Sequence, residues 1–243
     1  MHPRHNHQFA FKRKKLKRST LVSLIVLAVI LADQILKIWV KTNMEYGEEF
    51  GILGLNWARI HFVENEGMAF GITLGGAKGK LLLSVFRILA VAFLIYIIHN
   101  LIKAKESKGL LACFALILAG AIGNILDSAF YGVIFSNSMY HGGIAEMFPE
   151  GGGYAGFLFG KVVDMLYFPM VDTHFPDWFP FWGGDRFQFF RPVFNIADSA
   201  ISIGVISLIL FHRQFLKSGG ASLEKEAVAT SLTPGSEASQ EEE

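Results

Sequence analysis

The sequence predicts an α-helical polytopic membrane protein, and composition and apolar segment length carry that prediction. Hydrophobic residues make up 52% of the 243 residues, only 18% are charged, and the mean hydropathy is +0.40. A soluble domain usually has about a quarter of its residues charged. Four apolar stretches reach the length of about 20 residues that a bilayer-crossing helix needs, and they cover residues 20–40, 81–102, 109–131 and 193–212.

The same composition argues against other classes of protein. One cysteine excludes a disulfide scaffold and a cysteine-rich zinc site. Basic residues gather in short flanks instead of spreading over a folded surface, so we expect no nucleic-acid partner. The first apolar stretch is too long for a cleaved secretory signal, and the small-residue pattern near Ala32 fits a cleavage site poorly.

Lysine and arginine residues predict the orientation of the four spans, because they concentrate on the cytoplasmic side of membrane proteins. They flank the start of the first span, the link between the second and third spans, and the end of the fourth: Lys12, Arg13, Lys14, Lys15, Lys17, Arg18, Lys103, Lys105, Lys108, Arg213 and Lys217. Both termini are therefore expected in the cytoplasm. The longer connections, residues 42–80 and 132–192, are expected outside.

The two outer segments differ in pattern. In residues 46–72, stretches such as Trp57 to Val63 alternate between apolar and polar side chains, which predicts short strands with glycine turns. The second segment contains a glycine-rich stretch at 142–160. Aromatic residues then crowd positions 168–194, a composition typical of a segment lying along the headgroup layer. Residues 1–217 are expected to form one domain, and the Ser-, Ala- and Glu-rich residues 218–243 a disordered cytoplasmic tail.

Ionisable and amide side chains interrupt the apolar spans. Each charge near the bilayer centre costs at least about 2.5 kcal/mol, so each one needs a reason. They recur at helical spacing within a span and include Asp33 and Lys37 in the first, Asn124 and Asp127 in the third, and Asn195, Asp198 and Ser202 in the fourth. Arg87 in the second span is interpreted as structural or interfacial.

Depth within the membrane connects these residues. With a rise of about 1.5 Å per residue, Asp33, Asp127 and Asp198 reach a common level in the outer part of the bilayer. This agreement favours one shared polar site. A neutralised structural pair of Asp33 and Lys37 remains an alternative, as do interhelical hydrogen bonds from Asn124 and Asn195.

Intramembrane carboxylates suggest two kinds of chemistry. In an aspartic protease two carboxyl groups share a proton, so that one acts as acid while the other activates water. In a small ion- or proton-coupled transporter they form a relay. A zinc enzyme is disfavoured because the sequence contains no His-Glu-x-x-His motif. A second acid for a protease pair is offered by Asp164, which lies in the apolar, strand-like run 162–165 of the outer segment.

Four ordered sequence blocks resemble prolipoprotein signal peptidase, also called signal peptidase II, a family of bacterial membrane aspartic proteases. The blocks are Asp33-Gln34-Ile35-Leu36-Lys37, then Asn65-Glu66-Gly67-Met68-Ala69-Phe70-Gly71, then Gly123-Asn124-Ile125-Leu126-Asp127, and finally Val162-Val163-Asp164-Met165 with Phe194-Asn195-Ile196-Ala197-Asp198-Ser199. Each motif alone is weak, whereas the ordered set is specific.

The resemblance implies a four-transmembrane-helix bundle with a small extracytoplasmic β-cradle and a membrane-lying outer segment. Asp164 and Asp198 are implied as the catalytic pair. The implied substrate-binding or supporting residues are Asp33, Lys37, Asn65, Gly67, Asn124, Asp127, Asn195 and Ala197.

The implied function is an aspartic endopeptidase of the bacterial cytoplasmic (inner) membrane. It removes the signal peptide from diacylglyceryl-modified prolipoproteins by cleaving just before the lipidated cysteine. The implied partners are this precursor, membrane lipid and the inhibitor globomycin, and neither a metal nor an organic cofactor is expected. One departure is that Ser128 follows Asp127 where the family usually has arginine. Arg186 and Arg191 are the candidates to replace that arginine.

Overall fold

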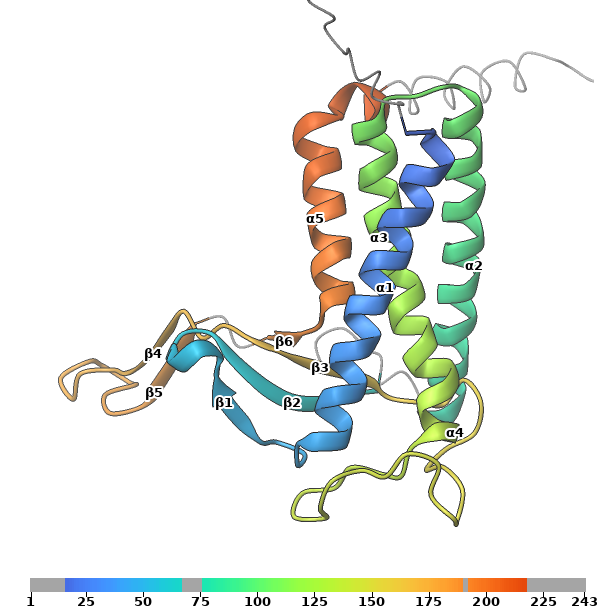
Figure 1. The fold of residues 1–243 in the computed structure, drawn as a ribbon. Coiled ribbons are helices and arrows are strands. Elements are labelled where there is room, and N and C mark those ends of the chain that lie inside the picture. The colour runs from blue at the N-terminus through green and yellow to red at the C-terminus, as the bar shows by residue number, and fades with distance from the viewer. Residues whose placement is uncertain (1–15, 67–75, 190–191, 218–243) are drawn as a thin grey trace, which may run out of the picture.

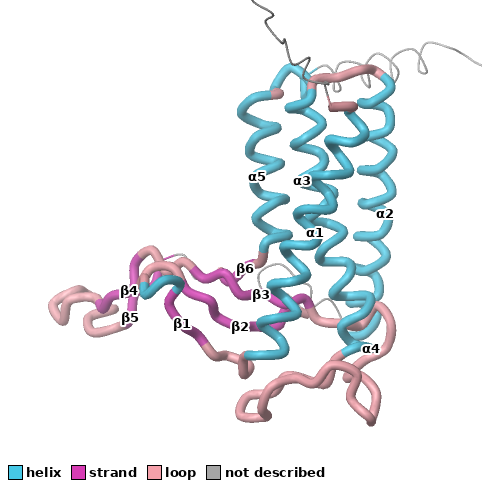
Figure 2. Tube along the Cα trace, in the orientation of Figure 1, coloured by secondary structure: helices cyan, strands magenta, loops and turns pink. Residues whose placement is uncertain are grey.

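The structure, a computed structural model, describes residues 16–66, 76–189 and 192–217. The described residues do not include Gly67, Arg191 or the predicted tail at 218–243. The described chain forms a bundle of long helices with small β-sheets at one end (Figures 1 and 2). The four helices of the bundle are α1 (Arg18–Asn43), α2 (Gly76–Lys103), α3 (Lys108–Leu126) and α5 (Ile196–Phe211).

Helix α3 is the packing centre of the bundle and contacts α1, α2 and α5. Its glycines allow α5 to approach very closely, since a Cβ atom added to Gly120 would lie 2.2 Å from the carbonyl oxygen of Ala197. Large apolar side chains on the outer faces of α1, α2 and α5 are exposed, among them Leu27, Ile35, Phe86, Phe93, Ile206 and Leu210. Such outward apolar faces suit helices surrounded by lipid.

Within the described residues, three helical segments are long and apolar enough to cross a membrane, namely Arg18–Asn43, Gly79–Lys103 and Lys108–Ile134. They confirm a helical polytopic membrane protein and overlap the predicted spans at 20–40, 81–102 and 109–131. The fourth apolar helix, α5, has only 16 residues. Its start corrects the prediction of a span beginning at 193. Val193 and Phe194 form strand β6 instead, because they pair with Tyr167 and Leu166 of a neighbouring strand.

The main sheet lies at the end of the bundle where α1 finishes and α5 begins (Figure 1). Its strand order is β1-β2-β3-β6, all neighbours being antiparallel, and the strands are β1 (Glu49–Gly51), β2 (Arg59–Asn65), β3 (Val162–Tyr167) and β6 (Val193–Phe194). A short 3-10 turn, η1 (Ile52–Gly54), joins β1 to β2. The alternation predicted around Trp57 to Val63 is thus a real strand.

The sheet is attached to the bundle by an apolar core. Val40 and Met44 from the end of α1 pack with Phe62 of β2 and with Val163 and Met165 of β3, and all five are buried. Two residues of this core, Val163 and Met165, directly precede and follow Asp164 in sequence. It therefore fixes the strand that carries that carboxylate against α1.

The segment between α3 and β3 also depends on backbone contacts. Helix α3 continues through a single π-helical turn, η3 (Asp127–Tyr131), and the short α4 (Gly132–Ile134). The returning chain comes so close that a Cβ atom on Gly160 would lie 2.2 Å from the carbonyl oxygen of Asp127, and the Gly160 amide donates to the Ser128 oxygen at 2.8 Å. Glycine is required for this approach, which places the start of β3 beside Asp127.

Candidate active site

Lys37 of α1 is the centre of a buried ionic cluster at the end of the bundle that carries the sheet. Its Nζ lies 2.8 Å from Oδ2 of Asp33 and 2.8 Å from Oδ2 of Asp127, and it donates to Oδ1 of Asn124 at 3.0 Å. Lys37 and Asp127 are completely buried. Because an unpaired charge is very costly at such a position, Lys37 neutralises part of the negative charge that the two acids bring.

Asp127 accepts hydrogen bonds on both carboxylate oxygens. Gln34 donates to its Oδ1 at 2.9 Å, and the Val163 amide donates to its Oδ2 at 3.2 Å. Tyr131 in turn donates to Oε1 of Gln34 at 3.2 Å. Sequence reasoning gave Gln34 no role, although it lies inside the first quoted motif. Through these partners, Asp127 connects the end of α3 to α1 and β3.

The first turn of α5 is held by two polar side chains. The N-cap residue Asn195 accepts through Oδ1 from the Asp198 amide at 2.8 Å, and Asp33 accepts through Oδ1 from the Ala197 amide at 2.8 Å. These amides have no partner within the helix, so external acceptors stabilise its start. Asp33 and Asn195 therefore determine where α5 begins and in which direction Asp198 points.

The two predicted catalytic acids are joined by a chain of amide side chains. Asn195 donates through Nδ2 to Oδ1 of Asp164 at 2.7 Å, and Asn124 donates through Nδ2 to Oδ1 of Asp198 at 2.7 Å. The Asn195 Nδ2 also lies within hydrogen-bond distance, 3.1 Å, of Oδ1 of Asn124. One strand and two helices thus bring both carboxyl groups to one place, although they are 34 residues apart in sequence.

The environments of the two acids differ. Asp164 is only 3% exposed, whereas Asp198 is partly exposed. Burial, together with the nearby negative charge of Asp198, raises the pKa of Asp164 to about 7, although the charge of Lys37 and hydrogen bonds from Asn195 and Asn65 oppose this rise. Near neutral pH the Asp164 carboxyl therefore still holds its proton in part of the molecules. A protonated acid beside a more open one is the arrangement that acid–base hydrolysis requires.

An arginine reaches this cluster from α2. Arg87 donates through Nη1 to Oγ of Ser128 at 3.2 Å, and its positive charge interacts favourably with Asp198, Asp127 and Asp164. Ser128 is the position where an arginine was expected. The structure brings Arg87 to this position, while Arg186 lies on β5 of a separate two-stranded sheet. The sequence, from which Arg87 was interpreted as structural or interfacial, gave no sign of this contact.

Asn65 ends strand β2 next to the site. Its Cα pairs with Val162, two residues before Asp164, and its side chain hydrogen-bonds the Asp164 carboxyl group. The residue before it, Glu64, forms a second buried ionic contact with Lys41, and Lys41 also donates to Oγ of Ser138 at 2.8 Å. This second cluster was not anticipated. It ties the segment that follows α4 to α1 and β2.

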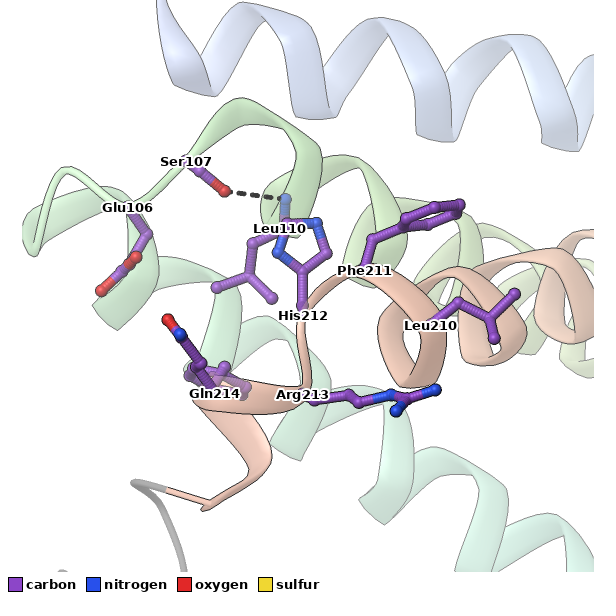
Figure 3. Close-up of a pocket in the computed structure, with 9 residues that line it drawn as sticks. Glu106, Ser107, Leu110, Leu210, Phe211, His212, Arg213 and Gln214 are labelled. Atoms are coloured by element: carbon purple, nitrogen blue, oxygen red, sulfur yellow. Dashed lines mark hydrogen bonds between the residues drawn. The ribbon is translucent and has the colours of Figure 1, made fainter.

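The structure gathers nearly all of the predicted site residues. Asp33, Lys37, Asn124, Asp127, Asp164, Asn195 and Asp198 form one connected network, Asn65 borders it, and Ala197 contributes its backbone amide. Gly67 belongs to the residues outside the description. A pocket at the opposite end of the bundle is separate from this network, and Figure 3 shows that it is lined by Glu106, Ser107, Leu110, Leu210, His212 and Arg213 among others.

Comparison with known proteins identifies the family. The family model described as "Signal peptidase (SPase) II" matches residues 25–214, which include most of α1, all of α2 to α5 and the whole polar network. The chain belongs to the signal peptidase II family. This bears out the resemblance seen in the four sequence blocks, and a family of proteases gives no support to a transporter.

Relatives named lipoprotein signal peptidase confirm the membership. The protein of that name from Porphyromonas gingivalis is 52% identical over 199 residues, covering 82% of this chain and 85% of the relative. The one from Amoebophilus asiaticus is 40% identical over 192 residues, covering 78% and 76%. A solved bacterial membrane enzyme shares the fold with a TM-score of 0.50 and 24% identity, over 82% of this chain and 88% of that structure.

Proposed function

We propose that this chain is an aspartic endopeptidase that removes the signal peptide from diacylglyceryl-modified prolipoproteins, cleaving just before the lipidated cysteine. Membership in the signal peptidase II family supports the substrate. The observation that carries the catalytic type is the amide chain that joins Asp164 to Asp198 through Asn195 and Asn124. Two carboxyl groups held in this way can share one proton and one water molecule.

The different environments of the two acids suggest their roles. Asp164, buried and with a raised pKa, holds the proton and donates it to the carbonyl oxygen of the scissile peptide. Asp198 in the first turn of α5 accepts the proton of the attacking water. The helix N-terminus and the Asn124 amide both stabilise its negative charge. The roles then reverse when the amine leaves.

The supporting residues hold this pair. Asp33 and Asn195 set the start of α5, Lys37 and Asp127 brace the base of the site, and Asn65 bonds Asp164. The network contains four carboxyl groups, Asp33, Asp127, Asp164 and Asp198, against one lysine. We infer that Arg87 supplies the second positive charge and thereby helps to hold Asp198 in place. This makes Arg87 a positioning residue for the reaction.

The membrane arrangement follows from the same residues. α5 serves as the fourth span, with both termini in the cytoplasm and the sheet at the outer surface as the β-cradle. The basic residues near Arg18, Lys105 and Arg213 at the opposite end of the bundle support this orientation. The lipid tail of the substrate enters between helices from the outer leaflet, and its binding positions the peptide over Asp198, which lowers the barrier. Globomycin is expected to occupy the same site.

Two variants test the catalytic pair. Asp164→Asn and Asp198→Asn preserve shape but remove proton exchange, so each should lower cleavage of purified diacylglyceryl-prolipoprotein in lipid by at least about 10³-fold. Globomycin should block the wild-type reaction. The exposed Asp177→Asn is the matched control and should retain full activity. Near-normal cleavage by either dyad variant, in protein shown to be folded, contradicts the assignment.

A further inference from the structure

The chain between β3 and β6 forms an aromatic hairpin, here defined as residues 171–189. Strands β4 (Val171–His174) and β5 (Arg186–Phe189) pair in a sheet of their own. Figure 1 shows this hairpin projecting sideways from the sheet end of the bundle, across the direction of the helices. Because it joins the strand that carries Asp164 to the strand that leads into Asn195, its position affects both parts of the candidate site.

The hairpin is internally ordered by stacked rings. Phe175 lies 4.9 Å from Phe179 and 5.1 Å from Phe187 between ring centroids, and Phe179 lies 6.2 Å from Trp182. Backbone hydrogen bonds close the turn, with the Phe175 amide donating to the Asp185 oxygen at 2.9 Å. The stack supports a defined tip instead of a loose loop.

The tip directs other large apolar side chains away from the protein. Trp178 is 79% exposed and Phe181 is 95% exposed, and Trp182 at the edge of the stack is also exposed. So many neighbouring aromatic groups on one short hairpin mark an interaction surface, because monomeric soluble proteins avoid such patches. The hairpin also carries exposed Asp177 and Asp185, so an acidic surface is an unfavourable partner.

Continuity with the lipid-facing helices identifies the partner. Exposed Trp39 on α1 packs edge-on against Phe50 of β1, at 6.4 Å between ring centroids. Trp57 lies 6.3 Å from Phe168, which is next to the base of the hairpin. Aromatic side chains thus extend from the outer face of the bundle across the sheet to the hairpin. Tryptophan prefers the boundary between water and hydrocarbon, where its ring is buried and its N–H stays hydrated.

We propose that the aromatic hairpin inserts Trp178, Phe181 and Trp182 into the interface of the outer lipid leaflet and so anchors the sheet to the membrane surface. The anchor holds β3 and the start of α5 at a fixed height relative to the lipid. Apolar contact drives the insertion, so neither salt nor anionic lipid is needed. The proposal rests on the proposed orientation of the bundle, with the sheet at the outer surface, and not on peptidase chemistry.

Tryptophan fluorescence of the full-length protein in lipid nanodiscs tests the insertion. The chain has four tryptophans, so replacing Trp39, Trp57 and Trp182 by Phe leaves Trp178 as the reporter. Its emission should be quenched by phospholipids that carry a nitroxide at the headgroup or upper acyl chain, and only weakly by aqueous acrylamide. Quenching in neutral nanodiscs should be at least as strong as in anionic nanodiscs, because exposed Asp177 and Asp185 disfavour an anionic surface.

The matched control places a single tryptophan elsewhere on the outer side. Phe148→Trp, in a background with all four native tryptophans replaced by Phe, reports on an exposed site in the glycine-rich insertion. Acrylamide should quench this reporter and the labelled lipids should not. Acrylamide quenching of Trp178 to the same degree, with labelled lipids silent, overturns the proposal.

Two further results have defined meanings. Shielding of Trp178 from both acrylamide and labelled lipid indicates a protein partner, such as a second copy of the chain, and also overturns the proposal. Trp178→Ser with Phe181→Ser, which keeps the stacked rings of Phe175, Phe179 and Phe187, should lower cleavage of lipidated precursor in bilayers about tenfold by misplacing the site. If labelled lipid quenches Trp178 in a protein that cleaves no precursor, the proposed function is contradicted and the proposed membrane anchor is still supported.

Discussion

Asp164 is buried, and burial favours its neutral form, whereas Asp198 is partly exposed. Burial and the charge of Asp198 raise the pKa of Asp164, and the charge of Lys37 together with the amides of Asn195 and Asn65 only partly offsets this rise. A carboxyl group with a raised pKa is an acid that still has a proton to give near neutral pH.

The pH dependence of cleavage should reveal whether the Asp164 carboxyl group is protonated. Since the pKa of Asp164 is raised to about 7, the donor form is present below that pH and is lost as the pH rises through it. The value of kcat/KM should therefore fall above about pH 7 by about tenfold per pH unit. Rates of signal-peptide release across this range measure the effect. A rate that stays constant well above neutrality contradicts Asp164 as the proton donor.

Arg87 and Ser128 make a reciprocal test possible. Ser128 lies one helical turn after Asn124, to whose carbonyl oxygen it donates at 3.1 Å, and Arg87 donates to it from α2. An arginine at either of the two positions can therefore serve the same acids. Arg87→Ala should lower kcat about 10- to 100-fold, because a charged contact contributes about 1.5–3 kcal/mol.

The second-site variant distinguishes positioning from folding. Ser128→Arg alone should lower activity. Ser128 is buried, so the new arginine and Arg87 would place two guanidinium groups in the same space. Combined with Arg87→Ala it should restore most of the lost activity. Cleavage assays on the two single variants and the double variant decide this. A folded double variant no better than Arg87→Ala contradicts the role of Arg87.

Helices α3 and α5 are separated by so little space that glycine is needed on both. A Cβ atom on Gly120 would lie 2.2 Å from the Ala197 oxygen, and one on Gly204 would lie 2.7 Å from the Cys113 oxygen. The close approach is also what lets Asn124 of α3 reach Asp198 of α5. Packing and catalysis are therefore connected through the spacing of these two helices.

Gly120→Ala tests that connection. The added methyl group forces α5 away, which should cost about 1–3 kcal/mol of stability and lower activity by lengthening the contact between Asn124 and Asp198. Thermal unfolding in detergent and cleavage rates measure both effects. Gly151→Ala, where nothing lies within 4 Å of the added Cβ, is the control. A Gly120→Ala protein with unchanged Tm and activity contradicts the argument.

Hydropathy and residue spacing predicted which helices and strands form better than they predicted the residues at which these elements begin and end. The apolar runs predicted the helices, and the alternation from Trp57 to Val63 predicted β2. Hydropathy alone could not reveal that Val193 and Phe194 leave the apolar run to pair with β3, because strand pairing depends on a distant segment. The cap at Asn195 is the local signal that marks the true start of α5.

In the whole molecule, the link between α2 and α3 and the segment that follows α4 lie at opposite ends of the bundle (Figure 1). Lys105 belongs to the first of these and Phe148 to the second. A membrane-impermeant maleimide tests the proposed orientation, because the single cysteine, Cys113, is buried. In a Cys113→Ser background, Phe148→Cys should be labelled in intact cells, whereas Lys105→Cys should react only after permeabilisation. Labelling in the reverse order contradicts cytoplasmic termini.

The sequence predicted which residues belong to the candidate site more fully than it predicted the contacts between them. Common depth and motif resemblance identified Asp33, Asp127 and Asp198 as neighbours, because helix geometry converts sequence position into height. Which acid pairs with Lys37, and that Arg87 approaches from α2, depend on how the helices are rotated against each other. No local pattern encodes that rotation. The Lys41–Glu64 contact was missed for the same reason.

The shortness of α5 has a consequence for the surrounding lipid. Sixteen residues at about 1.5 Å each span about 24 Å, which is less than the hydrocarbon thickness of about 30 Å. With α5 as the proposed fourth span, we expect this hydrophobic mismatch to draw the outer leaflet inward around the helix, at a cost of fractions of a kcal/mol per Å. Such local thinning would bring the water boundary closer to Asp198, so that the proposed hydrolysis could obtain its water directly from the outer surface.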